Sequence, residues 1–375
     1  MINFESIINE CEAIIHEQWT DGIALTFGTS AESNFINRGT VAGSNSSLIN
    51  DETLFDLASV TKFFSLITIL KLVENGFFSL NDTVGMHTSS YPHLKTIKIY
   101  ELMNFTHQIE TSARISTCET YEQALNVLQK ATIRNSVCSY TDMGVLILSK
   151  IIDEILAPYH SSFQIYSEKL WKQIGLTNTY WWFSLPKTAN NNIQNYDYEY
   201  KTINNELVPI RTSIGHVHDK KAYVLKACGH AGIFSCTSDI CRLLQMLLSG
   251  KILSAETIEL LTSSTYDSYS KNNHYGLLCY KKYADLCQSE IPELCSSKSI
   301  AMTGYTGTYI LVDFENDFFV FIGANRLYKR NTTSNMNTQI TIEKISPIVI
   351  CNTKNYVYRK DSLRDKMITQ LITIV

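Results

Sequence analysis

One run of residues, 63–73, restricts what this chain can fold into more than any other part of the sequence. Its apolar side chains lie almost all round a helix, interrupted by Ser65, Thr68 and Lys71. A helix without a polar face must be covered on every side, so it belongs in the core of a sizeable fold. The run is also too short for a membrane span of about 20 residues. We therefore expect a large folded protein built around one buried helix.

The residues beside this run predict where the helix ends. The string Asp56-Leu-Ala-Ser-Val-Thr-Lys62 opens it, and Gly76 follows Asn75 as a terminator, because glycine readily takes the left-handed conformation that closes a helix. Periodicity predicts further helices over 4–19, 121–129, 143–156 and 238–248. The whole stretch from 97 to 171 is expected to be mostly helical. Strands are expected over 22–27, 35–41, 275–280, 309–314 and 318–324, the last two joined by a hairpin at Glu315-Asn316-Asp317.

Strands near both ends, with helices between them, predict an α/β (α+β) fold in which both termini contribute to one sheet and a helical lobe is inserted. The 375 residues suit one large or two modest domains, and we expect a single domain over 1–375. Its sheet lobe spans about 1–60 and 228–375, and its helical lobe spans about 61–227. A cleft between two lobes is the default place for a ligand.

Composition and charge narrow the choice of partner and compartment. With 45% apolar and 18% charged residues, the chain is neither disordered, nor collagen, nor a coiled coil. A net charge of −4 leaves no electrostatic footprint for nucleic acid or an anionic membrane. Acids at Glu5, Glu10 and Glu12 do not fit a secretory signal, so a cytoplasmic location is expected. The ten scattered cysteines, without a C-x-x-C pair, are expected to be reduced thiols.

A nucleophile is indicated at Ser59. Residues three apart share a face of a helix, so the Lys62 amine can reach the Ser59 hydroxyl. Burial disfavours the charged form of a lysine, which would let Lys62 act as a base toward the serine. The alternative is a purely structural role, in which the serine caps the helix and the lysine extends to solvent. The same S-x-x-K spacing occurs at Ser184/Lys187, with a proline in the gap, and at Ser268/Lys271, in a polar stretch without helical periodicity.

Several stretches, in one order along the chain, carry a family resemblance. They are Leu54-Phe-Asp-Leu-Ala-Ser59-Val-Thr-Lys62, Leu72-Val-Glu-Asn-Gly-Phe-Phe-Ser-Leu-Asn-Asp82, Tyr140-Thr-Asp142, His218-Asp-Lys-Lys-Ala-Tyr223, Cys228-Gly-His-Ala-Gly-Ile-Phe-Ser235, and Thr303-Gly-Tyr-Thr-Gly-Thr308 with Ala324-Asn-Arg326. This series resembles the serine β-lactamases and penicillin-binding proteins, in particular the class C β-lactamase and serine-esterase branch. The resemblance spans about 50–326 and implies a β-lactamase/transpeptidase-like fold, an antiparallel sheet flanked by helices with an inserted all-helical lobe.

The resemblance also implies roles for individual residues. Ser59 matches the acylated nucleophile and Lys62 its base. Tyr140 matches the tyrosine that passes a proton to the leaving group, and Asp142 matches the residue that hydrogen-bonds the lysine and the substrate. The backbone N–H groups of Ser59 and Tyr305 match the oxyanion hole. Without the resemblance, Tyr140 would be an ordinary aromatic at a helix start, and Asp142 an acid favoured by the helix dipole.

The chain departs from the family pattern around the expected substrate cleft. The third motif normally begins with lysine or histidine, but here Met302 precedes Thr303 and Gly304. A thioether cannot hold a substrate carboxylate, so β-lactamase or carboxypeptidase activity becomes less favoured than action on neutral esters or amides. Phe105 and His107 also replace the usual residues of a segment that borders the cleft, although a structural role is the commoner explanation for such a histidine.

These residues predict a serine hydrolase that acts through an acyl-enzyme on an ester or amide, with a small-molecule or peptide-like acyl substrate and no cofactor. An acyltransferase would use the same acyl-enzyme, and a binding protein would keep the fold without turnover. A zinc site at His216, His218 and His230 is the rival mechanism, but the spacing does not match a metallo-β-lactamase. Sequence leaves the acyl group, the leaving group and the oligomeric state open.

Overall fold

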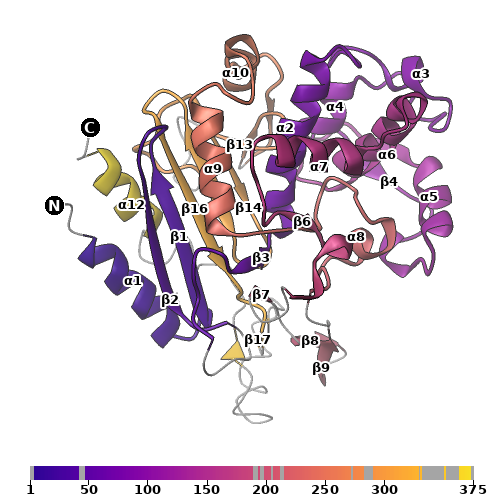
Figure 1. Ribbon diagram of the computed structural model, residues 1–375. Helices are drawn as coiled ribbons and strands as arrows, with labels where there is room; N and C mark the ends of the chain where they lie inside the picture. The colour runs from indigo at the N-terminus through magenta and orange to yellow at the C-terminus, as the bar shows by residue number, and fades with distance from the viewer. Residues whose placement is uncertain are drawn as a thin grey trace.

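The computed structural model describes residues 4–41, 47–188, 193–194, 198–203, 206–211, 215–271, 273–282, 290–328, 330–331, 350–351 and 363–372. Its main feature is an eight-stranded antiparallel sheet in the order β11-β12-β13-β14-β15-β16-β1-β2 (Figure 1). The strands are β1 Gly22–Gly28, β2 Ser33–Gly39, β11 Ser268–Tyr269, β12 His274–Tyr275, β13 Tyr280–Lys281, β14 Ser299–Thr303, β15 Tyr309–Asp313 and β16 Phe318–Ala324. Because β1 pairs with β16, the expectation that both ends of the chain build one sheet is confirmed.

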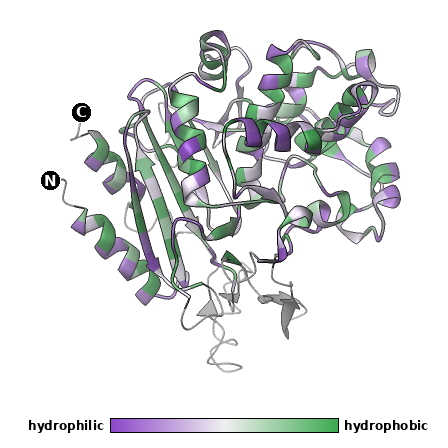
Figure 2. Cartoon of the chain, in the orientation of Figure 1, coloured by the Kyte–Doolittle hydropathy of each residue, from purple (hydrophilic) through white to green (hydrophobic). Residues whose placement is uncertain are grey.

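Helices cover both faces of this sheet. α1 (Glu5–His16) and α12 (Leu363–Ile372) pack together on one face, and α9 (Thr237–Leu248) lies against β1 and β16 on the other (Figure 1). Covering on both faces explains why every residue of β1 and β16 is buried and why their hydrophobic runs do not alternate with polar residues. α1 instead alternates hydrophobic and hydrophilic residues, as expected for a helix with one exposed side (Figure 2).

The remaining helices gather beside the sheet (Figure 1). They are α2 Thr61–Glu74, α3 Val84–His87, α4 Ile99–Met103, α5 Tyr121–Gln129, α6 Met143–Leu156, α7 Phe163–Gln173, α8 Lys220–Leu225 and α10 Ala255–Thr262, with short 3-10 turns η1 Ala58–Val60, η2 Ile115–Thr117, η3 Ala157–Tyr159 and η4 Trp182–Ser184. α2 is buried along nearly its whole length, as its sequence predicts. Gly76, with φ +74°, closes it in the left-handed conformation.

Smaller sheets complete the fold. One has the order β6-β10-β3-β7, and another has the order β18-β17-β8-β9. A third sheet pairs β4 with β5. The strands of these sheets are β3 Leu54–Asp56, β4 Gln108–Glu110, β5 Thr132–Asn135, β6 Tyr180–Trp181, β7 Ile193–Gln194, β8 Tyr198–Ile203, β9 Glu206–Arg211, β10 Ile233–Ser235, β17 Arg330–Asn331 and β18 Ile350–Cys351. The division of one domain into two lobes at the predicted boundaries stays a prediction.

Two local expectations are wrong. Residues 56–60 do not begin a helix, because 54–56 form β3 and a 3-10 turn precedes α2. Residues 275–280 do not form one strand, because Leu278 has φ +53° and the chain turns there, with the Gly276 N–H donating to the Cys279 carbonyl at 3.0 Å. The hairpin between β15 and β16 is confirmed.

Two further findings concern thiols and membranes. Eight cysteines in the described part of the chain are free thiols, while Cys287 and the side chain of Cys351 lie outside it. None of the helices within the described ranges combines the length and apolar character needed to cross a membrane.

Candidate active site

Ser59 lies on the 3-10 turn that joins β3 to α2, and it is partly exposed. The turn is sharp, because Ala58 has φ +46°, a left-handed conformation that non-glycine residues adopt at an energetic cost. Asp56 supports it by accepting a hydrogen bond from the Ala58 N–H at 2.9 Å. Asp56 is buried, and burial raises the pKa of its carboxyl even though the N–H groups of His218 and Ala58 oppose that effect. The serine therefore projects from a tightly constrained turn.

The loop with Tyr305 packs against this turn. The Thr306 hydroxyl donates to the Asp56 carbonyl at 2.7 Å, and the Thr308 hydroxyl donates to the Leu57 carbonyl at 2.9 Å. A Cβ atom at Gly304 would lie 2.6 Å from the Leu57 carbonyl oxygen and still closer to Thr308, so this approach requires glycine. The two segments that carry the expected oxyanion-hole N–H groups are thus held together.

Lys62 is the centre of the site. It is fully buried, and its Nζ lies 3.2 Å from the Ser59 Oγ. The same ammonium donates to Asp142 Oδ1 at 2.7 Å and to the His230 carbonyl at 3.3 Å. Its Nζ also lies 4.9 Å from the centre of the Tyr140 ring. The predicted contact between Ser59 and Lys62 is therefore present, and the second motif adjoins it.

The protonation of Lys62 differs from the sequence-based expectation. Burial by itself would lower the pKa of this lysine, but the Asp142 carboxylate and the nearby Tyr140 outweigh burial and raise the pKa above its ordinary value. The resting side chain therefore carries a proton. The expectation that burial alone leaves Lys62 neutral is wrong, because it ignored an anion from a distant part of the chain.

Asp142 holds a second ammonium group as well. It stands directly before α6, and its Oδ2 accepts a hydrogen bond from Lys221 Nζ at 2.7 Å. Burial would raise the pKa of Asp142, but Lys62, His230 and Lys221 together lower it well below its ordinary value. Burial would lower the pKa of Lys221, whereas Asp142 and Asp219 raise it. The carboxylate thus joins two charged lysines.

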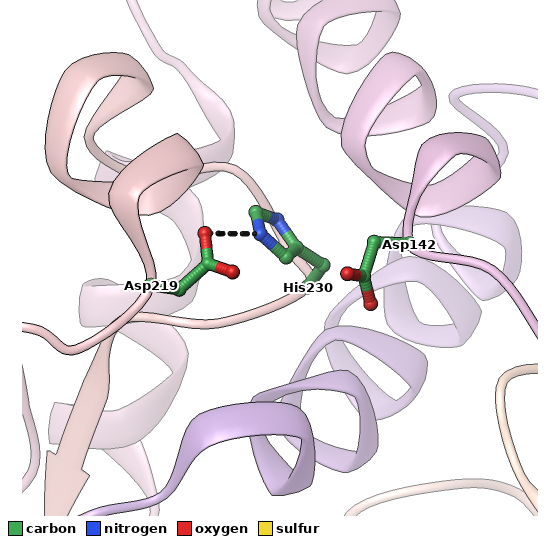
Figure 3. Close-up of side chains that lie close together, drawn as sticks. All are labelled: Asp142, Asp219 and His230. Atoms are coloured by element: carbon green, nitrogen blue, oxygen red, sulfur yellow. Dashed lines mark hydrogen bonds and ion pairs between the residues drawn. The ribbon is translucent and has the colours of Figure 1, made fainter. Parts of the chain in front are cut away.

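Asp219 and His230 form the far side of this cluster. Figure 3 shows the Asp219 carboxylate directed at the His230 ring, with Asp142 on the other side of the histidine, and Asp219 Oδ1 lies 2.9 Å from His230 Nε2. Burial would lower the pKa of His230, but the Cys228 thiol and Asp219 raise it. The direction of the shift favours the protonated ring, which pairs with Asp219.

Tyr140 is held by aromatic side chains. Its ring stacks on Phe105 at 5.1 Å between ring centres and on Tyr280 at 6.0 Å. Its hydroxyl lies 4.0 Å from the sulfur of Met302, a fully buried residue of β14. Phe105 has φ +61° and is buried, so it supports the tyrosine from an unusual backbone conformation. The methionine therefore stands beside Tyr140, and Thr303 follows it at the end of the strand.

Other predicted residues lie apart from the reacting groups. The ring nitrogens of His107 contact Ser136 Oγ at 3.1 Å and Glu101 Oε1 at 3.3 Å, which favours the structural role. Ser268 donates to the Asn104 carbonyl and lies in β11. Ser184 donates to the Trp181 carbonyl, and Lys187 is exposed. The geometry therefore favours Ser59 among the three serines.

The three histidines of the rival metal site are not brought together as ligands. His216 stacks on Tyr223, and His218 stacks on Tyr305. Within the described ranges, the group close enough to hold a metal consists of Asp142, Asp219 and His230 (Figure 3). Both oxygens of Asp142 already bind an ammonium group at 2.7 Å. This donor set fits an ion-pair network better than a cation site, because a metal would have to displace two lysines.

Sequence reasoning missed Lys221, Asp219 and Asp56 as members of the site. All three lie within stretches that carry the family resemblance, so the sequence did indicate that these stretches belong near the site. No spacing rule indicates that Lys221, rather than Lys220, faces Asp142. Their side-chain contacts depend on segments that are distant along the chain.

Comparison with known proteins adds an independent result. A family model described as Beta-lactamase matches residues 11–342. A protein of Escherichia coli O157:H7, provisionally named D-alanyl-D-alanine carboxypeptidase, is 24% identical over 306 residues, which cover 73% of this chain and 69% of that protein.

Solved structures share the fold. EstCE1, described as a hydrolase with promiscuous acyltransferase activity, has a TM-score of 0.68 at 18% identity and matches 86% of this chain and 93% of its own. A class C beta-lactamase has a TM-score of 0.65 at 14% identity and matches 90% of this chain and 94% of its own. The β-lactamase/transpeptidase-like fold is therefore present, and the chain belongs to the beta-lactamase family of serine hydrolases.

Proposed function

We propose that this chain hydrolyses a neutral ester or amide, such as a peptide-like acyl compound, through an acyl-enzyme at Ser59. The observation that carries the proposal is the 3.2 Å contact between Ser59 Oγ and the buried Lys62 Nζ. A serine needs a partner that removes its proton before it can attack a carbonyl carbon. Lys62 is the group within reach, and Asp142 orients it through the 2.7 Å contact.

The chemical steps follow from these positions. The unprotonated form of Lys62 accepts the Ser59 proton while Oγ bonds to the substrate carbonyl carbon. Backbone N–H groups of Ser59 and Tyr305 stabilise the resulting oxyanion. Lys62 then returns this proton by way of the Tyr140 hydroxyl to the leaving group, which departs as its bond to the carbonyl carbon breaks and the acyl-enzyme forms. Water releases the acyl group by the reverse proton transfers, and none of these steps requires a metal ion.

Met302 supports a substrate without a carboxylate at this position. The residue is fully buried and places its sulfur, not an ammonium group, beside Tyr140. A carboxylate desolvated there would lack a cationic partner from position 302, which disfavours its binding. Arg326 is nearly buried, donates from Nε to the Tyr305 carbonyl at 2.6 Å and lies over the Tyr305 ring at 4.5 Å, so it helps to hold that loop.

Acyl transfer is a second candidate. EstCE1, which shares the fold, is described as having promiscuous acyltransferase activity. An alcohol or amine would replace water in the second half of the reaction and would use the same Ser59, Lys62 and Tyr140. Product analysis with a neutral aryl ester, in water and in competition with added alcohol or amine, separates hydrolysis from transfer.

The decisive test is an intact-mass measurement after incubation with a fluorophosphonate probe. We expect one adduct on the wild-type chain and none on Ser59→Ala. The controls Ser184→Ala and Ser268→Ala should label like the wild type. Adduct formation that survives in Ser59→Ala but disappears in either control would show that Ser59 is not the nucleophile. A wild-type chain that takes no label would instead favour a binding protein that keeps the fold without turnover.

A further inference from the structure

Lys221 is a second lysine at the site, and neither spacing nor the family motif gives it a role. Its Nζ donates to Asp142 Oδ2 at 2.7 Å, while Lys62 takes Oδ1 at the same distance. About a quarter of the Lys221 side chain is exposed, and the same holds for Asp142. The Lys221–Asp142 pair therefore lies at the solvent-exposed edge of the site, whereas Lys62 lies wholly in the protein interior.

The helix that carries Lys221 is fixed relative to the nucleophile. Asp219 caps α8 by accepting from the Ala222 N–H at 2.9 Å, and it pairs with His230 at the same distance. One residue earlier, the His218 N–H donates to Asp56 Oδ2 at 2.9 Å. Because Asp56 also supports the turn with Ser59, one carboxylate ties α8 and that turn together. This arrangement directs Lys221 at Asp142.

The position of Lys221 matters because β14 supplies no cation. The corresponding strand position in the resembling family carries lysine or histidine, whereas Met302 offers a thioether at 4.0 Å from the Tyr140 hydroxyl. Lys221 reaches the second motif from α8 instead. A positive charge there both occupies one carboxylate oxygen and repels the ammonium of Lys62.

We propose that Lys221 is a positioning residue that supplies the cation absent from position 302. It holds Asp142 Oδ2 and so leaves Lys62 a single carboxylate oxygen. Lys62 therefore stays able to release its proton. This inference rests on the proposed acyl-enzyme function. The charged and titratable groups around Lys62 are Tyr140 and Asp142 before α6, Asp219 and Lys221 at the start of α8, and His230 before β10. Among them, Lys221 is the lysine that opposes the proton on Lys62.

The experiment compares Lys221→Met and Lys221→Gln with Lys221→Arg, and it uses Lys220→Met as the matched control. Lys220 is exposed on the same helix. Carbon NMR of the lysine side chains, with the Lys62 signal assigned by its loss in Lys62→Met, gives the titration midpoint of Lys62 directly. The rate of labelling by a fluorophosphonate at neutral pH gives its consequence for acylation.

Both neutral variants should move the Lys62 midpoint upward by about one pH unit, because both remove a repelling charge; Lys221→Met also leaves Asp142 to Lys62 alone. Labelling should fall about tenfold at neutral pH, since the unprotonated fraction of Lys62 falls by the same factor. Lys221→Arg keeps the charge, so its midpoint should match the wild type and its rate should stay within about threefold. Lys220→Met should change neither quantity. A merely structural role predicts no shift of the midpoint.

An unchanged or lower Lys62 midpoint in a folded neutral variant would overturn the inference. So would an equal loss of rate in Lys221→Arg. Lys221→Gln retains a donor for Asp142 and serves if Lys221→Met does not fold. If the wild-type chain takes no label, the proposed function fails, and the NMR titration still decides the role of Lys221.

Discussion

Replacing Asp142 with asparagine tests the central ion-pair network most directly. The substitution keeps the shape of the side chain and removes the negative charge between Lys62 and Lys221. Lys62 is fully buried and would lose its anionic partner, while Lys221 would retain Asp219 at 3.5 Å. Breaking a buried ion pair by removing one partner lowers the free energy of unfolding by about 3–5 kcal/mol. Because asparagine still offers a carbonyl oxygen, we expect about 3 kcal/mol near neutral pH.

The substitution should make stability depend on pH in a range where the wild-type ion pair contributes a constant stability. In the wild type, folding lowers the pKa of Asp142 and raises that of Lys62. The Asp142 contribution is present above its unfolded pKa of about 3.9 and is lost as pH falls through the lower folded value. The Lys62 contribution is present below its unfolded pKa of about 10.4 and is lost as pH rises through the higher folded value. Between these limits the pair contributes a constant stability.

In Asp142→Asn, burial is no longer outweighed, so the folded pKa of Lys62 should fall below about 10.4. The unfolded chain then binds more protons than the folded chain between the two pKa values. Stability should therefore rise with pH in that window, by at most about 1.4 kcal/mol per pH unit. The deficit relative to the wild type should shrink as the buffer becomes more alkaline.

Urea unfolding followed by fluorescence, at about pH 7 and about pH 9.5, measures both effects. The control Glu259→Gln removes an exposed carboxylate that contacts Lys298 at 2.9 Å, and its urea midpoint should match the wild type at both pH values. An Asp142→Asn variant with an undiminished urea midpoint at pH 7, and no rise relative to wild type at the higher pH, would refute the electrostatic account of Lys62.

Three further predictions concern catalysis. The double mutant Lys62→Ala/Tyr140→Phe should lose less activity than the product of the two single losses, because both residues handle one proton; multiplicative losses in kcat/KM would show independent action. Exhaustive chelation with EDTA should leave the ester-hydrolysis rate unchanged, and stoichiometric zinc with loss of activity on chelation would favour a metal mechanism. Met302→Lys should improve acylation by a benzylpenicillin-type substrate, relative to a neutral aryl ester, by about 5- to 150-fold. Equal use of both substrates by the wild type, unaffected by Met302→Lys, would place the carboxylate-binding cation elsewhere.

Local features of the site were predictable from the sequence because they depend on neighbouring residues. The apolar run over 63–73 required a buried helix, and α2 is one. Ser59 and Lys62 are three residues apart, so a tight turn entering a helix places their side chains near each other, and they lie 3.2 Å apart. The order of the motifs indicated the family, which the match over 11–342 bears out.

Tertiary structure alone decided the electrostatics of the site. Lys62 and Lys221 meet Asp142 across 80 and 79 residues of sequence, and no periodicity reports contacts of that range. Burial by itself predicts a neutral Lys62, and the Asp142 carboxylate, with Tyr140, reverses that result. The division of 275–280 into β12 and β13 likewise follows from pairing with neighbouring strands. A side chain's charge depends on every group within a few ångströms, and the fold alone determines which groups those are.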